Sequence, residues 1–302
     1  KDGLRSHVFA VPVWGGEEQG NHYLLVTDMA PGRLYAVKPI FTKDDTVWRS
    51  DDAGASWRPI AFTFKSDSRY NLQDNYVNSW FQSMQGWTTC AAAIDPKNPD
   101  RLLFNHYCSI FMTDNGGRNW RAAEILPAPG NPRRESRPHL RQRWINNGLV
   151  NTTTWHHYID PVDHRRRFIA YTDIGLARST DTGATWSWER HLGSNTYEMA
   201  FDPAIPGRIW AAFGLMHDVP NNNIVLMEQP QQGQGCVGFT DDGGLTWRGM
   251  NRGLPGYSEE NKYDGDTMSS LAAGVQSIVV DPRSPKDSRT LYASIWEHGV
   301  YK

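Results

Sequence analysis

The sequence predicts an all-β fold, a β-propeller of four-stranded antiparallel blades, from three observations. One eight-residue pattern, Ser/Thr-x-Asp/Asn-x-Gly-x-Ser/Thr/Asn-Trp, begins at Ser50, Thr113, Ser179 and Thr240, so 63, 66 and 61 residues separate its copies. A nearly fixed period of this size is typical of repeat architectures. Short runs of alternating apolar and polar residues, rich in β-branched and aromatic types, flank each copy and indicate strands.

Each copy is expected to form the hairpin turn between two strands. The Asp or Asn side chain accepts hydrogen bonds from backbone N–H groups of its own turn, and Gly supplies the positive φ of a tight hairpin. The Trp then offers a large apolar surface between neighbouring repeats. Because every repeat needs this turn, we expect its carboxylates to be structural and not catalytic. The residues are Asp52, Asn115, Asp181 and Asp242, with Trp57, Trp120, Trp186 and Trp247.

Around each copy the chain follows one order: strand a, an Asp-Pro turn, strand b, strand c, the repeated turn and strand d. In the first three blades we expect strands at 23–27, 34–37, 46–50 and 57–62, at 88–94, 102–107, 109–113 and 120–125, and at 153–159, 168–172, 176–179 and 186–190. The fourth blade shows 208–213 and a strand near Cys236, and the fifth shows 275–280, 291–295 and 300–302. Four antiparallel strands repeated radially make a β-propeller.

We therefore expect a single domain over residues 1–302 with about five blades. Their approximate bounds are 22–62, 87–126, 150–192, 196–251 and 272–302. The last blade is incomplete, because a fifth repeated turn would fall just past Lys302. Either residues 7–13 supply the missing strand or the chain is part of a larger propeller, and we favour the larger propeller because an open ring leaves sheet edges exposed. The repeated pattern resembles the Asp-box, or BNR, motif, and the chain resembles the Asp-box β-propeller proteins.

Composition excludes several classes of protein. A net charge of −2 gives no basic field for nucleic acid, and no apolar run is long enough for a membrane-spanning helix. No cofactor or metal is expected, because no His/Cys/Asp spacing makes a convincing metal site. Cys90 and Cys108 lie symmetrically about a turn, which permits a disulfide or two buried thiols. The protein type favours a secreted, extracellular or periplasmic location.

The long connections indicate where function lies. Short a–b turns and short repeated turns share one face of a propeller, whereas the insertions 63–86, 127–148, 214–235 and 253–273 all fall on the other. Loops held by a rigid scaffold are where binding and catalysis concentrate. We call this the functional face.

Carboxylates at one position of the b–c connections are candidates for glycoside hydrolysis, which needs a pair of them. Six residues before each repeated turn stand Asp44, Tyr107, Asp173 and Gln234, and register adds Glu297 in the last blade. Asp and Asn are also common in such turns simply as backbone caps, and for any single residue this is the favoured explanation.

The segment Phe168-Ile-Ala-Tyr-Thr-Asp173-Ile-Gly175 resembles a segment of the xyloglucan-active endoglucanases of glycoside hydrolase family 74. The resemblance implies that Asp173 is the general base of an inverting mechanism on xyloglucan or another β-glucan. This sequence departs from the family at Leu176, where the family has a second Gly, and the family's acid comes from a second propeller. Glu297 is the acid only by register. Sialidases also carry Asp boxes, but their Arg-Ile-Pro segment is absent here, which argues against a sialidase.

Other residues of the functional face are candidates for substrate binding. Exposed aromatic rings in or beside the insertions would stack on sugar faces, and an arginine-rich loop suits carboxylate or sulfate ligands, although a solvated charged loop explains it equally well. Two adjacent histidines on strand a point to opposite sides, so one of them faces the channel or both are packed. The residues are Tyr76, Trp80, Trp87, Trp144, Trp155, His156, His157 and Arg134.

Three functions follow from these observations. The first is a carbohydrate-active propeller, a glycoside hydrolase with a polysaccharide or oligosaccharide as its partner. The second is a non-catalytic propeller that recognises protein or glycan, like sortilin-type receptors or photosystem-assembly factors. The third is a polysaccharide lyase that uses His156 or His157 with Tyr and Arg side chains.

Overall fold

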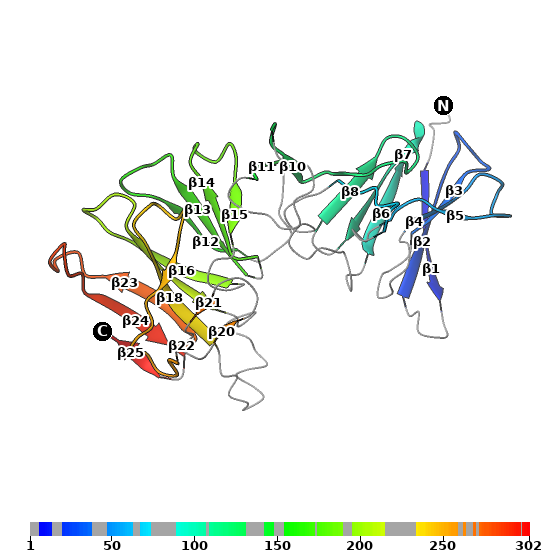
Figure 1. Ribbon diagram of the computed structural model, residues 1–302. Coiled ribbons are helices and arrows are strands. Elements are labelled where there is room, and N and C mark those ends of the chain that lie inside the picture. Colours follow the sequence, from blue (N-terminus) through cyan, green and yellow to red (C-terminus); the bar gives the residue numbers. More distant parts are fainter. Residues whose placement is uncertain are drawn as a thin grey trace. The chain divides into compact units, whose positions relative to one another are not determined.

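The computed structural model describes fifteen segments of the chain: residues 6–13, 20–37, 47–62, 67–73, 89–106, 109–130, 142–147, 154–172, 174–189, 195–214, 234–258, 262–263, 268–269, 272–296 and 298–302. Within these segments every regular element is a strand, and all the paired strands are antiparallel (Figure 1). No helix among the described residues has the length and apolar character to cross a membrane. The predicted all-β fold of antiparallel propeller blades is confirmed.

The chain divides into two compact units, of which unit 1 comprises residues 1–137 and 144–151. Its first sheet has the order β1 (Ser6–Val13), β2 (Gly20–Thr27), β3 (Leu34–Val37), β4 (Val47–Ser50) and β5 (Arg58–Pro59). Its second sheet has the order β6 (Thr89–Asp95), β7 (Asn98–His106), β8 (Ser109–Thr113) and β9 (Arg121–Ala122). A separate hairpin joins β10 (Ile125–Pro127) to β11 (Trp144–Asn146).

Unit 2 comprises residues 138–143 and 152–302, and its described residues form four sheets, three blades and one two-stranded hairpin. The third blade is β12 (Thr154–Ile159), β13 (Arg167–Tyr171), β14 (Leu176–Ser179) and β15 (Ser187–Glu189). The fourth is β16 (Asn195–Phe201), β17 (Ile209–Gly214), β18 (Gln234–Thr240) and β19 (Arg248–Gly249), with β22 (Ala272–Ala273) paired to β18. The last is β23 (Val275–Val280), β24 (Leu291–Ile295) and β25 (Gly299–Tyr301), and β20 (Lys262–Tyr263) pairs with β21 (Met268–Ser269).

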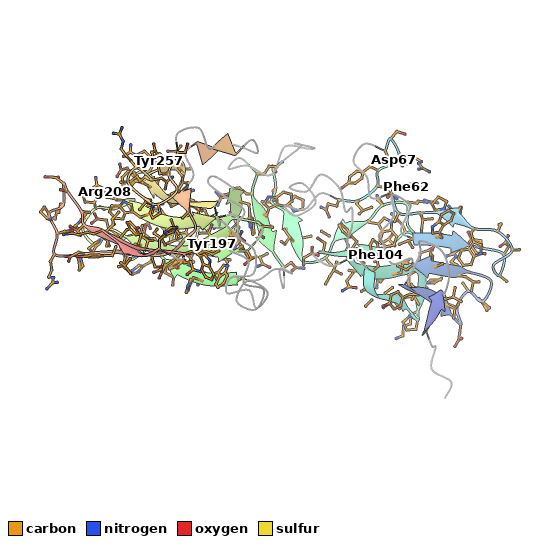
Figure 2. The ribbon with its side chains drawn as sticks, turned by 90° about the horizontal axis from the view of Figure 1, so that it is seen from below. Phe62, Asp67, Phe104, Tyr197, Arg208 and Tyr257 are labelled. Carbon is orange, nitrogen blue, oxygen red and sulfur yellow. The ribbon has the colours of Figure 1, made fainter. Side chains whose placement is uncertain are left out.

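Large apolar side chains between successive sheets form the cores. In unit 1 Tyr35 of the first blade and Phe104 of the second are fully buried in one cluster. In unit 2 Phe168 packs with Ile209 between the third and fourth blades, while Trp210 packs with Ile295 between the fourth and fifth. Figure 2 shows Phe104 and Tyr197 inside their respective units. Successive side chains of a strand point to opposite faces of its sheet, so apolar residues on both faces can contact the two neighbouring sheets.

The four repeated turns share one hydrogen-bond pattern. The hydroxyl at the first position accepts the backbone N–H of the Gly four residues later, as in Gly54 to Ser50 at 2.8 Å and Gly183 to Ser179 at 2.9 Å. The Asp or Asn at the third position accepts the backbone N–H four residues on, as in Thr185 to Asp181 at 2.9 Å. These side chains therefore satisfy backbone donors that the tight turn leaves without a ladder partner.

The Trp that ends each turn takes a different environment in each blade. Trp120 is 1% exposed and donates its Nε1–H to Ile60 O of the first blade at 2.9 Å, and Trp186 is 6% exposed. Trp247 packs edge-on against Phe213 within its own blade at 5.2 Å. Trp57 is 37% exposed and donates to Gly54 O of its own turn, so the expectation that it packs between repeats is wrong for the first blade.

Two further expectations are wrong, and a third concerns side chains outside the described residues. Residues 7–13 do not complete the last blade, because they belong to β1, which pairs along its whole length with β2. The insertion 127–148 is not a loop throughout, because β11 within it pairs with β10. The side chains of Cys90 and Cys108 lie outside the described part of the chain, so their pairing stays a prediction, whereas the thiol of Cys236 is buried and forms no disulfide with any described residue.

Candidate functional site

In the second to fifth blades the inner strand carries a β-bulge near its first residues, where it follows the d–a connection. The register shifts between Thr89 and Ala91 in β6, Thr154 and His156 in β12, Thr196 and Glu198 in β16, and Val275 and Ser277 in β23. A bulge leaves one residue unpaired and re-aims its side chain, and bulges are common beside active sites. In the third and fourth blades the bulged residues are Trp155 and Tyr197. The bulges and their recurrence cannot be predicted from the sequence, because one extra residue hardly changes the alternation of apolar and polar residues in a short strand.

The two bulged aromatic residues meet edge to face. The ring centroids of Trp155 and Tyr197 lie 5.9 Å apart at an interplanar angle of 79°. Tyr197 is 6% exposed and lies close against Gly214, where an added Cβ would come within 2.7 Å of its ring. Trp155 is half-buried, and its Nε1 is enclosed without a hydrogen-bond acceptor among the described residues. A rigid, partly exposed indole of this kind suits stacking on a sugar ring.

The b–c connection of the third blade is a tight turn supported from below by aromatic packing. Tyr171 N donates to Gly175 O at 3.0 Å, and Ile174 N donates to Thr172 O at 2.9 Å. Gly175 has a φ of 79°, which favours glycine. Tyr171 stacks on Trp188 at 6.0 Å, and burial raises the pKa of Tyr171 well above its usual range. The turn is thus held in one conformation at its base.

Both candidate catalytic carboxylates fall outside the described residues. Asp173 belongs by sequence to the turn between Tyr171 and Gly175, and Glu297 belongs to the connection after β24. Their roles, and the distance between them, stay predictions. The same holds for four of the candidate substrate-binding residues, namely Tyr76, Trp80, Trp87 and Arg134.

The two histidines of β12 point to opposite sides of the sheet. His156 is exposed, with its ring 5.5 Å from that of Tyr158, while the ring of His157 lies 6.4 Å from Trp186. Burial, and then the positive charge of Arg167, lowers the pKa of His157, so this imidazole is neutral at neutral pH. The structure does not bring the two imidazoles together as an acid–base pair.

Tyr158, the tyrosine beside the two histidines, makes a contact between the third and fourth blades. Its hydroxyl accepts the backbone N–H of Met199 at 3.1 Å, and burial, with a smaller effect of Glu198, raises the pKa of Tyr158 to about 12. The phenol therefore stays protonated at neutral pH, and one lone pair of its oxygen already serves as an acceptor.

Glu198 is a carboxylate of the inner strands that the sequence reasoning missed. By register it stands where His156 stands in the third blade and Ser277 in the fifth, immediately after the bulge. Its Oε2 accepts the backbone N–H of Ile278 at 3.2 Å, which ties the fourth blade to the fifth. Comparing inner strands at this position, rather than the b–c connections alone, would have revealed it.

Of the two candidate tryptophans that the structure describes, Trp155 and Trp144, the environment of Trp144 contradicts its assignment. It is 3% exposed in β11 and pairs opposite Pro127 of β10, so it offers no free face to a sugar. The hairpin that buries it was not expected from the sequence. Over the described segments, no group of three or more His, Cys, Asp or Glu side chains gathers in a way that could hold a metal ion.

Comparisons with known proteins give distant matches. No family model matches the chain. A sialidase from Clostridium perfringens is 29% identical over 147 residues, which is 45% of this chain and 37% of the sialidase. Among solved structures, the GH74 xyloglucanase from Xanthomonas campestris shares 14% identity at a TM-score of 0.30, covering 89% of this chain and 36% of the enzyme. The structure of YCF48 from Cyanidioschyzon merolae shares 12% identity at a TM-score of 0.28, covering 98% of this chain and 97% of that protein.

These matches have limited reach. The chain spans about a third of the length of the sialidase and of the xyloglucanase. Two of these three proteins, the sialidase and the xyloglucanase, are named as carbohydrate-active enzymes. Because the structural similarities are low, the assignment of an activity depends on the sequence similarity and on the residues of the functional face.

Proposed function

We propose that this chain belongs to a secreted, carbohydrate-active propeller that hydrolyses glycosidic bonds of a polysaccharide, with a xyloglucan-type β-glucan as the first candidate substrate. The observation that carries the proposal is the segment from Phe168 to Gly175, which resembles a family 74 segment and forms a tight turn on a buried aromatic base. The sequence similarity to a sialidase supports a carbohydrate-active protein in general.

In this proposal each group has a defined task. Asp173 acts as general base and activates the water that attacks the anomeric carbon, and a second carboxyl group donates a proton to the leaving oxygen. Glu297 is the candidate for that acid. The half-buried Trp155 supplies a stacking surface for a sugar ring, backed by Tyr197.

The direct test replaces Asp173 with Asn and measures release of reducing ends from xyloglucan. Loss of a general base removes roughly two to four orders of magnitude from the rate, whereas the neutral amide keeps the shape of the binding site. Asp287→Asn is the matched control, because Asp287 is an exposed aspartate on the turn between β23 and β24, at the opposite face. Undiminished activity in the Asp173 variant would exclude the assigned base.

A recognition propeller is the second candidate, because the Trp155–Tyr197 pair would bind a sugar or a peptide without any catalysis. Substitution of Trp155 by Ala distinguishes the two. In a recognition protein it weakens ligand binding and no product forms with any variant. In a hydrolase it lowers turnover of the polymer as well.

A further inference from the structure

A pocket lined by five arginines lies in unit 1, at the side of the a–b connections and the repeated turns. Its volume is about 710 Å³, and we call it the arginine pocket. Its guanidinium groups come from five different places: the first a–b connection, β4, β5, the segment after Phe62, and the second repeated turn. They are Arg33, Arg49, Arg58, Arg69 and Arg118.

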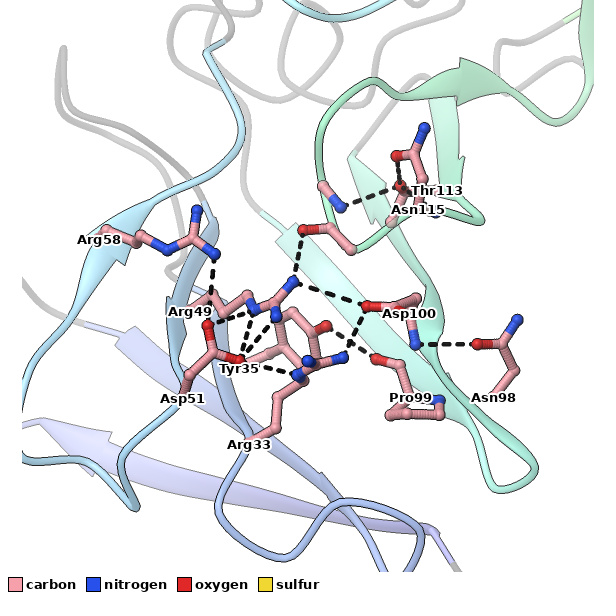
Figure 3. A network of polar contacts seen from close by, with 12 residues as sticks. Arg33, Tyr35, Arg49, Asp51, Arg58, Asn98, Pro99, Asp100, Thr113 and Asn115 are labelled. Carbon is pink, nitrogen blue, oxygen red and sulfur yellow. Dashed lines mark hydrogen bonds and ion pairs between the residues drawn. The ribbon is translucent and has the colours of Figure 1, made fainter.

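Two of these arginines are fixed by carboxylates in the floor of the pocket (Figure 3). Asp51 accepts hydrogen bonds from Arg49 Nη2 at 2.7 Å and from Arg33 Nε at 2.9 Å, and lies 3.3 Å from Arg58 Nη2. Asp100 of the second blade accepts from Arg33 Nη1 at 2.6 Å. The hydrogen bonds from Arg49 above all lower the pKa of Asp51 to about 2, so this network keeps its charges over the whole neutral range.

The rim of the pocket carries an excess of positive charge. The Arg58 side chain is 61% exposed and that of Arg69, which pairs with Asp67 at 2.7 Å, is 55% exposed. Arg118 is exposed and forms no ion pair with any residue in the described segments. Three carboxylates pair with these guanidinium groups, those of Asp51, Asp67 and Asp100, while Asp114, which also lines the pocket, pairs with Arg101 and Arg121.

The equivalent junction between the third and fourth blades shows which of these residues the fold itself requires. By strand register Arg166 and Arg178 stand where Arg33 and Arg49 stand. Arg178 Nε donates to Gly243 O at 2.7 Å, as Arg49 Nη1 donates to Gly116 O at 3.3 Å. This inner pair of arginines is thus part of how successive blades join.

Asp51 and Arg58 recur in other blades, because Asp114 pairs with Arg121 in the second blade and Asp241 lies 3.7 Å from Arg248 in the fourth. Asp100 and Arg118 have no charged counterpart at the third-to-fourth junction, where Gly207 and Leu245 stand in their places. Neither the blade junction nor the hairpin therefore explains Arg118. An exposed guanidinium group beside four others around a hollow is the chemistry that binds oxyanions through forked, charge-assisted hydrogen bonds.

We propose that the arginine pocket binds an organic anion that carries at least two carboxylate, sulfate or phosphate groups. Arg58 and Arg118 contact the anion at the rim, and Arg33 and Arg49 present a rigid, positively charged floor. A volume of about 710 Å³ exceeds what one inorganic ion fills and lies in the range of small-molecule sites. This site lies in unit 1, whereas the segment of the proposed hydrolytic site lies in unit 2, and it does not depend on that proposal.

The test is isothermal titration calorimetry of the full chain with citrate, sulfate and phosphate as separate probes at low ionic strength. We expect saturable binding of citrate that weakens as salt is added. The Arg58→Ala/Arg118→Ala double variant should bind about tenfold or more weakly, because two charge-assisted contacts are lost. Arg283→Ala, which removes one positive charge from a side chain 92% exposed in unit 2, is the single-charge control and should bind as the wild type does.

The probes also distinguish the chemistry of the anion. Tighter binding of citrate indicates carboxylate ligands, and tighter binding of sulfate or phosphate indicates tetrahedral ligands; both support the site. The proposal is overturned if no probe binds saturably to the wild type, or if the double variant, with an unchanged near-ultraviolet circular dichroism spectrum, binds as tightly. An equal loss in Arg283→Ala would likewise overturn it, because it would show a general charge effect.

Discussion

At the scale of single residues, Glu124 shows how the fold uses a buried carboxylate for a backbone contact. Its Oε2 accepts the N–H of Ile110 at 3.0 Å. Asn251 holds the equivalent position in the fourth blade, since each residue stands eleven positions after the start of its repeated turn, and Asn251 accepts the N–H of Val237 at 2.8 Å. A neutral amide thus makes in the fourth blade the contact that a carboxylate makes in the second. Burial raises the pKa of Glu124, so the charged form is unfavourable in the folded state.

We predict that Glu124→Gln raises the free energy of unfolding at pH 7. The amide oxygen keeps the hydrogen bond to Ile110 without the cost of a buried charge. The folded-state pKa of Glu124 lies above the unfolded value, so the free energy of unfolding of the wild type increases as pH falls through that pKa. The difference in this free energy between the wild type and the variant then becomes smaller. Urea unfolding between pH 5 and pH 8 measures this.

Glu124→Ala is the control, because it removes the acceptor and should lower stability by about 1–3 kcal/mol. A Gln variant that is less stable than the wild type at pH 7, with the same pH dependence, would show that the charge itself is required.

Several residue assignments were accessible from the sequence and others were not. Asp52, Asp181 and Asp242 each accept hydrogen bonds within their own turn, contacts set by residues at most four positions apart. The burial of Trp144 depends instead on Pro127, seventeen positions away, in a hairpin without a clear pattern. Tertiary neighbours decide such cases, and single-sequence patterns do not contain them.

At the scale of elements, the glycines of the repeated turns allow close contact between blades. Gly244 has a φ of +84°, and an added Cβ would lie 2.9 Å from the ring of Phe168 in the preceding blade. Gly117 holds the corresponding place in unit 1, where a Cβ would lie 2.5 Å from Ile60. The glycine pattern therefore serves both the turn conformation and the packing of the next sheet.

We predict that Gly244→Ala destabilises the protein more than Gly253→Ala does. Gly253 has a similar φ of +91° but nothing within 4 Å of the added Cβ. Its substitution therefore costs only the strain of placing alanine in a left-handed backbone conformation, about 1–2 kcal/mol. Gly244→Ala adds the clash with Phe168, about 1–3 kcal/mol more. Urea midpoints of both variants measure the difference, and equal midpoints would contradict the packing role.

Element boundaries followed from the sequence wherever alternation and turn residues agreed. The expected strands 109–113, 176–179, 275–280 and 291–295 coincide with β8, β14, β23 and β24. The strands after the repeated turns are shorter than expected, as β5 and β9 contain two residues each. Their outer position gives them one partner only, and alternation does not report where an edge strand stops pairing.

At the scale of the whole molecule, the repeated turns make both units sensitive to acid in the same pH range. Hydrogen bonds from Ser56 hold the pKa of Asp52 at about 2. For Asp181 and Asp242 burial opposes ionisation, but hydrogen bonds from the turn outweigh it and hold the pKa at about 2. These pKa values lie below the usual 3.8, so the charged carboxylates stabilise the folded state.

We predict that this stabilisation is fully present above about pH 4 and is lost as pH falls through about 2. An acid titration followed by near-ultraviolet circular dichroism at constant ionic strength should show loss of tertiary structure in that range. Asp181→Asn, which copies the natural Asn115 of the second blade, should lose less stability than the wild type between pH 4 and pH 2. A transition complete above pH 5 would contradict this account of the turns.

The central claim is that the protein acts on glycans, and one measurement addresses it most directly. Wild-type protein is incubated with xyloglucan, mixed-linkage β-glucan, an acidic polysaccharide and a sialoside, and release of reducing ends is followed over time. The account predicts release from a neutral β-glucan and none from the sialoside. If no reducing ends are released from any of the four substrates, the result contradicts a hydrolase and favours the recognition propeller. Release of sialic acid alone would contradict the proposed substrate and the assignment of Asp173.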